Sequence, residues 1–186
     1  MKHPGKPLHF MRDQSGVAAI EMALIFPVLL ILFVGLIDLT TLLSDNRRVS
    51  YSANVVADVV TRLQTPTTPQ EVGDSFEAAE LVMRAARAGP ARVEIYNYLR
   101  ENDGSTSLRW KRDNGVGTAC GAPDTGNLAD LMDRGNDVVV AVVCVTHAPI
   151  VTTILGWTPM GAASFSLRQQ IAMRPRNTLD LLCPLC

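Results

Sequence analysis

A run of 21 residues from Val17 to Ile37 contains a single charged side chain, Glu21, and it limits the possible folds more than any other segment. A hydrocarbon core about 30 Å thick requires about 20 helical residues, so the run is long enough to cross a membrane. The competing interpretation is a secretory signal peptide, whose apolar region has about 7–15 residues and ends at a small-residue cleavage site. This run is longer, and residues 38–43 contain no such site. We therefore predict a retained membrane-spanning helix.

Basic residues suggest the orientation of this helix. Lys2, Lys6 and Arg12 precede the run, which keeps the N-terminus in the cytoplasm under the positive-inside rule. Arg47 and Arg48 follow the run and weaken this asymmetry slightly. The expected location is the bacterial inner membrane, with a single span and a periplasmic head. A place for the head in an extracellular pilus stays open.

Net charge excludes one class of partner. The chain carries 17 basic and 18 acidic residues; residues 1–16 contribute three basic and one acidic, which leaves 14 basic and 17 acidic residues, a net charge of −3. This mildly acidic remainder lacks the basic field of a nucleic-acid-binding protein, so we expect no nucleic-acid partner.

Glu21 needs an explanation because an unpaired ionisable group inside a membrane span is costly. It lies about one turn from the start of the run, so its carboxylate can simply reach the headgroups. A functional alternative follows if the chain is cut after Gly16. Val17 would then carry a free α-amine, and Glu21 would be the fifth residue of the product. Between helices shifted along their axes, the Glu21 carboxylate of one chain can pair with the amine of the next, which would set the register.

The start of the apolar run resembles the signal of type IV prepilins. It has a glycine at position 16, a glutamate, Glu21, at the fifth position after it, and Pro27 six residues later. The segment GVAAIEMALIFPVLLILFVGLIDL resembles the TadE-like proteins of the tight-adherence (Flp) pilus system, which are minor pilins or pseudopilins. The closing segments VVVAVVCVTHAPI and SFSLRQQIAMRPRN are also similar to that family. Pro27 removes one helical hydrogen bond, so it is either a harmless kink or a packing feature.

The resemblance implies a set of partners and one processing step. A prepilin peptidase is expected to cut between Gly16 and Val17 on the cytoplasmic face and to leave the apolar helix in the product. The implied partners are the membrane, the prepilin peptidase, the major pilin, other minor pilins and the pilus assembly machinery.

Helical spacing continues beyond the apolar run. Apolar residues recur every three or four positions in 44–64, and no Gly or Pro lies between Leu36 and Thr65, so one helix should continue to about residue 64. The expected organisation is a cytoplasmic leader, a transmembrane helix, an amphipathic extension, an outer α+β head and a cysteine tail. Their ranges are 1–16, 17–43, 44–64, 65–182 and 183–186.

The sequence of the head predicts an α+β fold like that of type IV pilins. Thr68, Pro69 and Glu71 form a capping box for a helix that Gly89 and Pro90 should end. Alternating patterns predict strands at 92–99 and 108–112, joined by a turn. A short helix should lie within 126–136, a central strand covered on both faces at 137–147, and a last strand at 164–173, which gives a mostly antiparallel sheet. The apolar connection 149–161 either covers the core or is an exposed contact for a partner or the membrane surface.

The four cysteines are expected to be oxidised because the head lies on the oxidising side of the membrane. Four cysteines allow three pairings. We favour Cys120 with Cys144, which would attach a loop to the central strand. Cys183 and Cys186 then form either a small C-x-x-C loop or two free thiols.

Few residues suggest catalysis. The C-x-x-C at the tail has no following helix to lower a thiol pKa and no second ligand pair for zinc. His147 is expected to pack at a strand end. Tyr96, Tyr98 and Trp110 are expected on an ordinary sheet surface. A set of aspartates is expected in loops and caps, with a loose calcium site as the alternative; they are Asp124, Asp130, Asp133 and Asp137.

These patterns predict a membrane-anchored minor pilin or pseudopilin that is a structural and assembly component, without enzymatic activity or cofactors. One alternative is an uncleaved bitopic inner-membrane protein whose periplasmic head binds pilus-assembly or secretion partners. A second alternative is an oxidoreductase that uses the thiols of Cys183 and Cys186.

Overall fold

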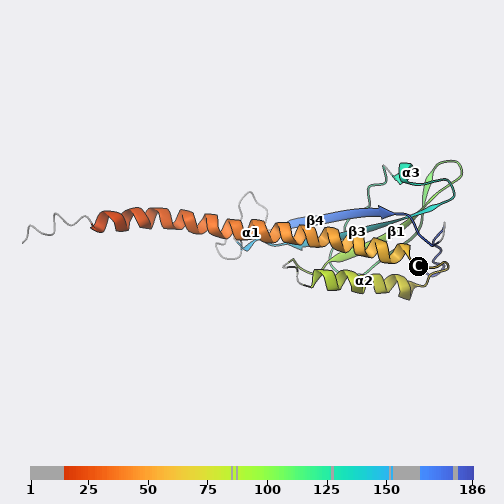
Figure 1. The fold of residues 1–186 in the computed structure, drawn as a ribbon, viewed down its shortest axis with the longest axis horizontal. Coiled ribbons are helices and arrows are strands. Elements are labelled where there is room, and N and C mark those ends of the chain that lie inside the picture. Colours follow the sequence, from red (N-terminus) through yellow and green to blue (C-terminus); the bar gives the residue numbers. More distant parts are fainter. Residues whose placement is uncertain are drawn as a thin grey trace, which may run out of the picture.

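The computed structural model describes residues 15–84, 86, 88–126, 128–150, 152, 164–177 and 180–186. One long helix extends from a head in which a second helix and a four-stranded sheet lie beside its C-terminal half (Figure 1). The expected fold class, α+β with a pilin-like layout, is confirmed. Most of the predicted leader and most of the apolar connection 149–161 lie outside the described residues.

The long helix, α1, covers Ser15–Thr61 and continues without a break through Pro27. Its 47 residues correspond to about 70 Å at 1.5 Å per residue. The first half projects away from the head (Figure 1), whereas a buried stripe begins at Asp45 and continues through Val49, Val56 and Val60. The predicted continuation of the apolar helix as an amphipathic one is confirmed, and the helix ends three residues before the expected position.

The second helix, α2, covers Pro69–Met83 and begins with the predicted capping box. The backbone N–H of Glu71 donates to the Thr68 hydroxyl, and the Glu71 carboxylate accepts from the Thr68 backbone N–H at 2.8 Å. The expected end at Gly89 and Pro90 is wrong: the helix ends at Met83, because backbone N–H groups beyond Arg84 donate to acceptors outside the helix. The N–H of Ala88 donates to the Asp45 carboxylate, and that of Gly89 donates to a carbonyl of the third strand.

Four antiparallel strands form the sheet, in the order β2-β1-β3-β4. The strands are β1 Arg92–Arg100, β2 Thr106–Asp113, β3 Asp137–His147 and β4 Phe165–Met173, and a one-turn helix, α3, covers Leu128–Leu131. The predicted hairpin, short helix, central strand and last strand are all present.

Both faces of the sheet are covered, which explains the near-continuous apolar sequence of β3. One face, with Val93, Ile95 and alternate residues of β3, packs on the buried stripes of α1 and α2. The opposite face, with Tyr96 and the remaining β3 valines, packs on Leu128 and Met132 of the α3 region. Figure 1 shows α1 and α2 on one side of the sheet and α3 on the other.

Three residues are placed differently from the expectation. Tyr96 and Trp110 were expected on the sheet surface, but both are buried, because the α3 region covers one face and the C-terminal segment covers part of the other. Asp137 was expected in a loop or cap, yet its side chain is buried at the start of β3. Alternation within a strand does not reveal that a distant segment will cover its second face.

Candidate functional site

The first 22 residues of α1, Ser15 to Leu36, contain the residues singled out by the resemblance, and no other described segment covers them. Apart from Val34, which is half-buried, the large apolar side chains between Val17 and Leu36 are 39–72% exposed. The most apolar 18-residue window of this helix has a mean hydropathy of 2.7 and none of it is buried, so the helix is long and apolar enough to cross a membrane. An apolar helix exposed on all sides requires an apolar environment from outside the chain: lipid or neighbouring helices.

Gly16, Val17 and Glu21 lie together in the first two turns of α1. Val17 and Glu21 are four residues apart, so their side chains lie on one face of the helix. The Glu21 side chain is exposed, and no described residue forms an ion pair with it. Pro27 lies farther along the same exposed segment, and the four cysteines lie in the head.

Glycine at position 16 has no packing reason within the fold. A Cβ atom built there would meet nothing within 4 Å, and the residue has an ordinary negative φ. Among the described residues, packing therefore does not require a glycine at this position. The first backbone N–H groups of a helix have no intrahelical partner, so the Gly16–Val17 bond lies where the helix opens most easily.

The Asp45 carboxylate connects α1 to the head, beyond the end of the exposed apolar segment of the helix. Its carboxylate lies 2.9 Å from Nδ1 of His147, at the end of β3, and accepts the backbone N–H of Ala88 at 3.1 Å. Asp45 and His147 are each only 2% exposed. The Asp45 carboxylate thus connects α1 to β3 and to the segment that follows α2. His147 packs at its strand end, as expected, but its buried carboxylate partner was not predicted.

Two further contacts strengthen this attachment. The Asp38 carboxylate accepts the backbone N–H of Ile150 at 2.7 Å, and the Gln169 amide of β4 donates to the Asn46 side chain at 3.2 Å. All three α1 residues, Asp38, Asp45 and Asn46, lie within nine positions of one another. The contacts hold the base of the head against the helix immediately beyond the exposed apolar segment.

The C-terminal segment closes the other end of the core. Leu181 is buried, and its N–H donates to the Asp137 carboxylate at 2.7 Å. Its carbonyl accepts from the Asn97 amide at 3.0 Å and from Trp110 Nε1 at 2.8 Å. Burial raises the pKa of Asp137, and the hydrogen bonds from Asn97 and Leu181 with the nearby Arg109 charge only partly offset that effect. Asn97 lies on an otherwise apolar face of β1, which indicates a buried partner but does not identify it as Leu181.

A third buried carboxylate, that of Glu94, lies on the opposite face of the sheet and accepts several hydrogen bonds. It accepts hydrogen bonds from the Tyr96 hydroxyl at 2.7 Å and from Arg92 Nε at 3.1 Å. It also accepts from the backbone N–H of Cys120 at 3.3 Å, and Lys111 lies 3.8 Å away. Burial alone would raise the pKa of Glu94, but these hydrogen bonds and the lysine charge outweigh burial and lower it. The lowered pKa keeps the Glu94 carboxylate ionised at neutral pH within this set of hydrogen bonds.

Both cysteine pairs are disulfides in the structure. Cys120 is joined to Cys144 of β3, the pair favoured from the sequence, and Cys183 is joined to Cys186. The first bond connects the segment that covers the sheet to the central strand, beside Glu94. The second closes a small loop at the C-terminus, next to the Leu181 contact.

Replacing both Cys120 and Cys144 by serine is expected to lower the free energy of unfolding of the head by about 3 kcal/mol, because the bond closes a loop with a sequence separation of 24. Chemical unfolding of the oxidised wild type, the double variant and the reduced wild type measures this effect. Peptide mapping without reductant should recover the two cysteines in one linked peptide. Recovery of both as free thiols from folded protein would contradict the pairing.

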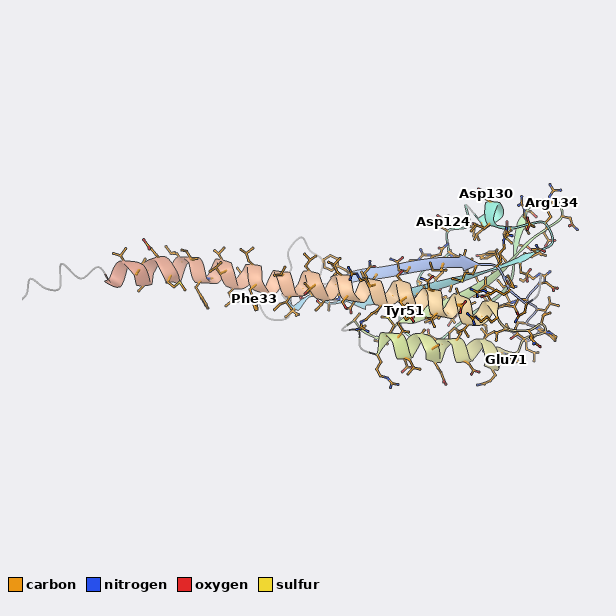
Figure 2. All side chains as sticks on the ribbon, in the orientation of Figure 1. Phe33, Tyr51, Glu71, Asp124, Asp130 and Arg134 are labelled. Atoms are coloured by element: carbon orange, nitrogen blue, oxygen red, sulfur yellow. A yellow bond between two sulfur atoms is a disulfide. The ribbon has the colours of Figure 1, made fainter. Side chains whose placement is uncertain are left out.

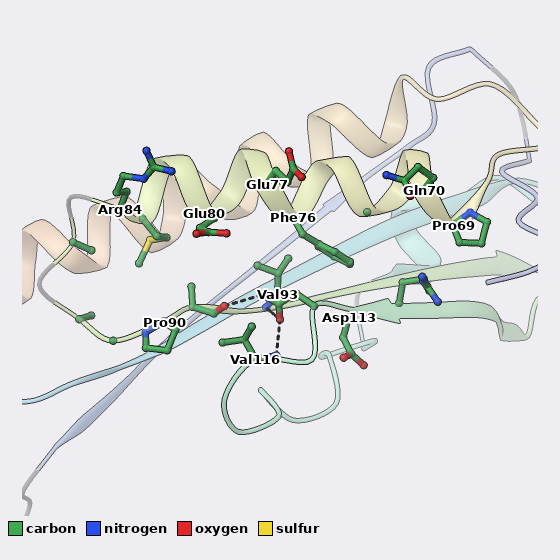
Figure 3. Close-up of a pocket in the computed structure, with 18 residues that line it drawn as sticks. Pro69, Gln70, Phe76, Glu77, Glu80, Arg84, Pro90, Val93, Asp113 and Val116 are labelled. Atoms are coloured by element: carbon green, nitrogen blue, oxygen red, sulfur yellow. Dashed lines mark hydrogen bonds between the residues drawn. The ribbon is translucent and has the colours of Figure 1, made fainter.

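One groove, about 840 Å³ in volume, separates α2 from the start of β1 and the end of β2 (Figure 3). Glu77, Glu80 and Arg84 line its helical wall, and Arg112 and Asp113 line the strand wall. Its described lining contains no histidine, cysteine or serine. Within the described part of the chain, no group of three or more His, Cys, Asp or Glu side chains is placed to hold a metal ion.

Comparison with known proteins gives one match. The family described as TadE-like protein has a model that matches residues 16–58. No curated protein matches the chain, and no solved structure does. The matched segment contains the exposed apolar helix, Gly16, Val17, Glu21 and the Asp45 attachment to the head. The match does not extend to the closing segments, VVVAVVCVTHAPI and SFSLRQQIAMRPRN, whose resemblance to the family stays a prediction. Residues 16–58 are similar to the TadE-like proteins, which confirms the resemblance drawn from the N-terminal segment and supports an association with the tight-adherence pilus system.

Proposed function

We propose that the chain is a minor pilin or pseudopilin, a structural and assembly component of a tight-adherence pilus, and that it is not an enzyme. The observation that carries this proposal is the division of α1 into two halves. The second half packs in the core of the head, whereas the first half has the length of a membrane span and is exposed on every side. The apolar half of such a helix can lie in the inner membrane while the head stays outside it, and can later join a bundle of similar helices.

The proposed first step is cleavage after Gly16 by a prepilin peptidase on the cytoplasmic face. Cleavage frees the α-amine of Val17 and removes only the first two residues of α1, Ser15 and Gly16. The amine carries a positive charge at neutral pH, since such groups titrate near pH 8. The product keeps its apolar helix and therefore stays in the membrane, with the head on the periplasmic side.

The proposed second step is registration of neighbouring helices through Glu21. Apolar helices in an apolar surrounding have little preference for one axial position, since no water is released when they slide. Val17 and Glu21 are separated by about 6 Å along the axis, so a neighbour shifted by about one turn brings its amine level with the carboxylate. The major pilin, other minor pilins and the assembly machinery are the proposed partners of this helix.

Substitution of Glu21 tests this mechanism. Glu21→Ala is expected to leave membrane insertion and cleavage intact, because Gly16 and the apolar run are unchanged, but to reduce crosslinking to the other pilins and the number of pili about tenfold. Glu21→Gln keeps the shape without the charge and should resemble alanine. Glu21→Asp keeps the charge with a shorter reach and should be intermediate.

Crosslinking yields, pilus counts and intact masses of the same samples separate assembly from cleavage. Full co-assembly by all three variants would contradict the register mechanism. Wild-type behaviour of Glu21→Gln alone would mean that a hydrogen bond, rather than an ion pair, sets the register.

A further inference from the structure

Two surfaces of the head that the described chain leaves open lie at opposite edges of the sheet. The first is the groove between α2 and the strands β1 and β2, the α2 groove. It is bounded by β2, an edge strand in the order β2-β1-β3-β4. The second, the α3 surface, consists of residues 130–134. It is held by Arg174, which directly follows β4 at the other edge, donates to the Leu131 carbonyl and pairs with the Asp133 carboxylate at 3.1 Å.

The α2 groove has an apolar floor between two walls of different charge. Phe76 points from α2 toward Val93 of β1 and fills part of the floor (Figure 3). On the strand wall, Arg112 forms no ion pair or hydrogen bond with a described residue, and its Nε is buried without a partner. On the helical wall, Glu77 and Glu80 carry negative charge. A matching occupant therefore presents an acid to the strand wall, a base to the helical wall and an apolar side chain between them.

The α3 surface carries this combination of side chains. Leu131 is 47% exposed, with the exposed Asp130 directly before it and the exposed Arg134 three residues after it. No described residue forms an ion pair or hydrogen bond with the Asp130 side chain. Figure 2 shows Asp130 and Arg134 on the side of the head opposite α2. The α3 surface therefore complements the α2 groove in both polarity and charge, but the two cannot meet within one chain.

The two surfaces lie at overlapping levels along the head. Arg112 pairs with Ile95 of β1, which pairs with Ala141 of β3. Leu131 lines a hollow with Val138, three residues from Ala141. Three strand residues correspond to about 10 Å, or one to two turns of a helix. Copies that stand side by side with parallel α1 helices and an axial shift of this size bring the α3 surface of one level with the α2 groove of the next.

We propose that the α3 surface of one copy binds in the α2 groove of a neighbouring copy of this chain. Leu131 enters the apolar floor, Asp130 pairs with Arg112, and Arg134 faces the acids of the helical wall. Because two different surfaces meet, the contact is heterologous and can repeat from copy to copy along a filament. This inference rests on the proposed function, since α1 helices in one bundle hold the heads at a high local concentration, where a small contact is sufficient.

Photo-crosslinking of the full chain in membranes tests this contact. A benzophenone amino acid in place of Leu131 is expected to crosslink to α2 or β1 of a second copy that carries a different tag, and mass spectrometry identifies the linked peptide. Arg112→Glu and Asp130→Arg should each lower the crosslink yield about tenfold, because an attractive pair of charges becomes a repulsive one. The double variant Arg112→Glu/Asp130→Arg restores opposite charges and should recover most of the wild-type yield.

Two charge reversals outside both surfaces are the matched controls. Arg47→Glu and Asp74→Arg change exposed residues that line neither the α2 groove nor the α3 surface, and each should leave the yield within twofold of the wild type. Equal losses in the controls, no recovery in the double variant, or crosslinks only to another protein would each overturn the contact between copies.

The intact mass of the crosslinked samples separates this contact from the pilin function. Absence of the crosslink between chains that begin at Val17 and enter pili would overturn the contact alone. A crosslink that is lost in the single variants and recovered in the double variant, but forms between chains that still begin at Met1, would support the contact and contradict cleavage instead.

Discussion

Leu181→Ala is expected to lower the free energy of unfolding of the head by about 4 kcal/mol, within the range for a fully buried leucine that leaves a cavity. The side chain of Leu181 is completely buried among residues of α1, α2 and the sheet. Its backbone N–H donates to the buried Asp137 carboxylate, and its carbonyl accepts from the side chains of Asn97 and Trp110. The substitution therefore leaves a cavity and loosens the hydrogen bonds that hold the C-terminal segment in place.

Chemical unfolding followed by Trp110 fluorescence measures this effect, because Trp110 donates directly to the Leu181 carbonyl. A Trp157→Phe background leaves Trp110 as the only tryptophan of the two in the chain. Leu182→Ala is the matched control, since its side chain is 42% exposed, and it should change stability by less than about 1 kcal/mol. An equally small effect of Leu181→Ala would show that the C-terminal segment is not part of the core.

Asp45→Ala is expected to lower the free energy of unfolding of the head by about 4 kcal/mol, because the buried side chain of His147 and the half-buried N–H of Ala88 both lose their acceptor. The loss should also detach the base of the head from α1, which predicts faster proteolysis between residues 84 and 92 than in the wild type. Unfolding by denaturant and limited proteolysis of the detergent-solubilised chain measure the two effects.

A double-mutant cycle with His147→Ala isolates the contribution of the pair. The two substitutions are expected to be less than additive by about 1–3 kcal/mol, as for residues in direct contact within one network. Strictly additive losses would mean that Asp45 and His147 stabilise the fold independently. Asp45→Asn, which keeps an acceptor oxygen for Ala88, should fall between the wild type and Asp45→Ala.

Local patterns were sufficient to predict most elements of this fold. The 3.6-residue periodicity located the extension of α1, and Thr68 with Glu71 fixed the start of α2. Two-residue alternation located the hairpin, and the run of β-branched residues at 137–147 placed β3 at an inner position of the sheet. Each of these signals lies within one segment of chain, where side chains that share a face are neighbours in sequence.

Contacts between distant segments could not be predicted in the same way. Asp45 and His147 are 102 positions apart, and Asn97 and Leu181 are 84 apart. A signal was nevertheless present, because Asp45 and Asn97 both occupy positions on otherwise apolar faces of their elements. A polar residue on an apolar face needs a buried partner, but its own segment does not specify which one. The end of α2 was misplaced for the same reason, since the residues that stop it belong to α1 and β3.

The intact mass of the protein isolated from membranes tests the central proposal most directly, namely that the chain is cleaved after Gly16 and then begins at Val17. The mass is expected to correspond to a chain that begins at Val17, and Gly16→Arg should restore a chain that begins at Met1. If every wild-type molecule still begins at Met1 while pili assemble normally, the pilin mechanism is contradicted, and an uncleaved bitopic membrane protein becomes the better account.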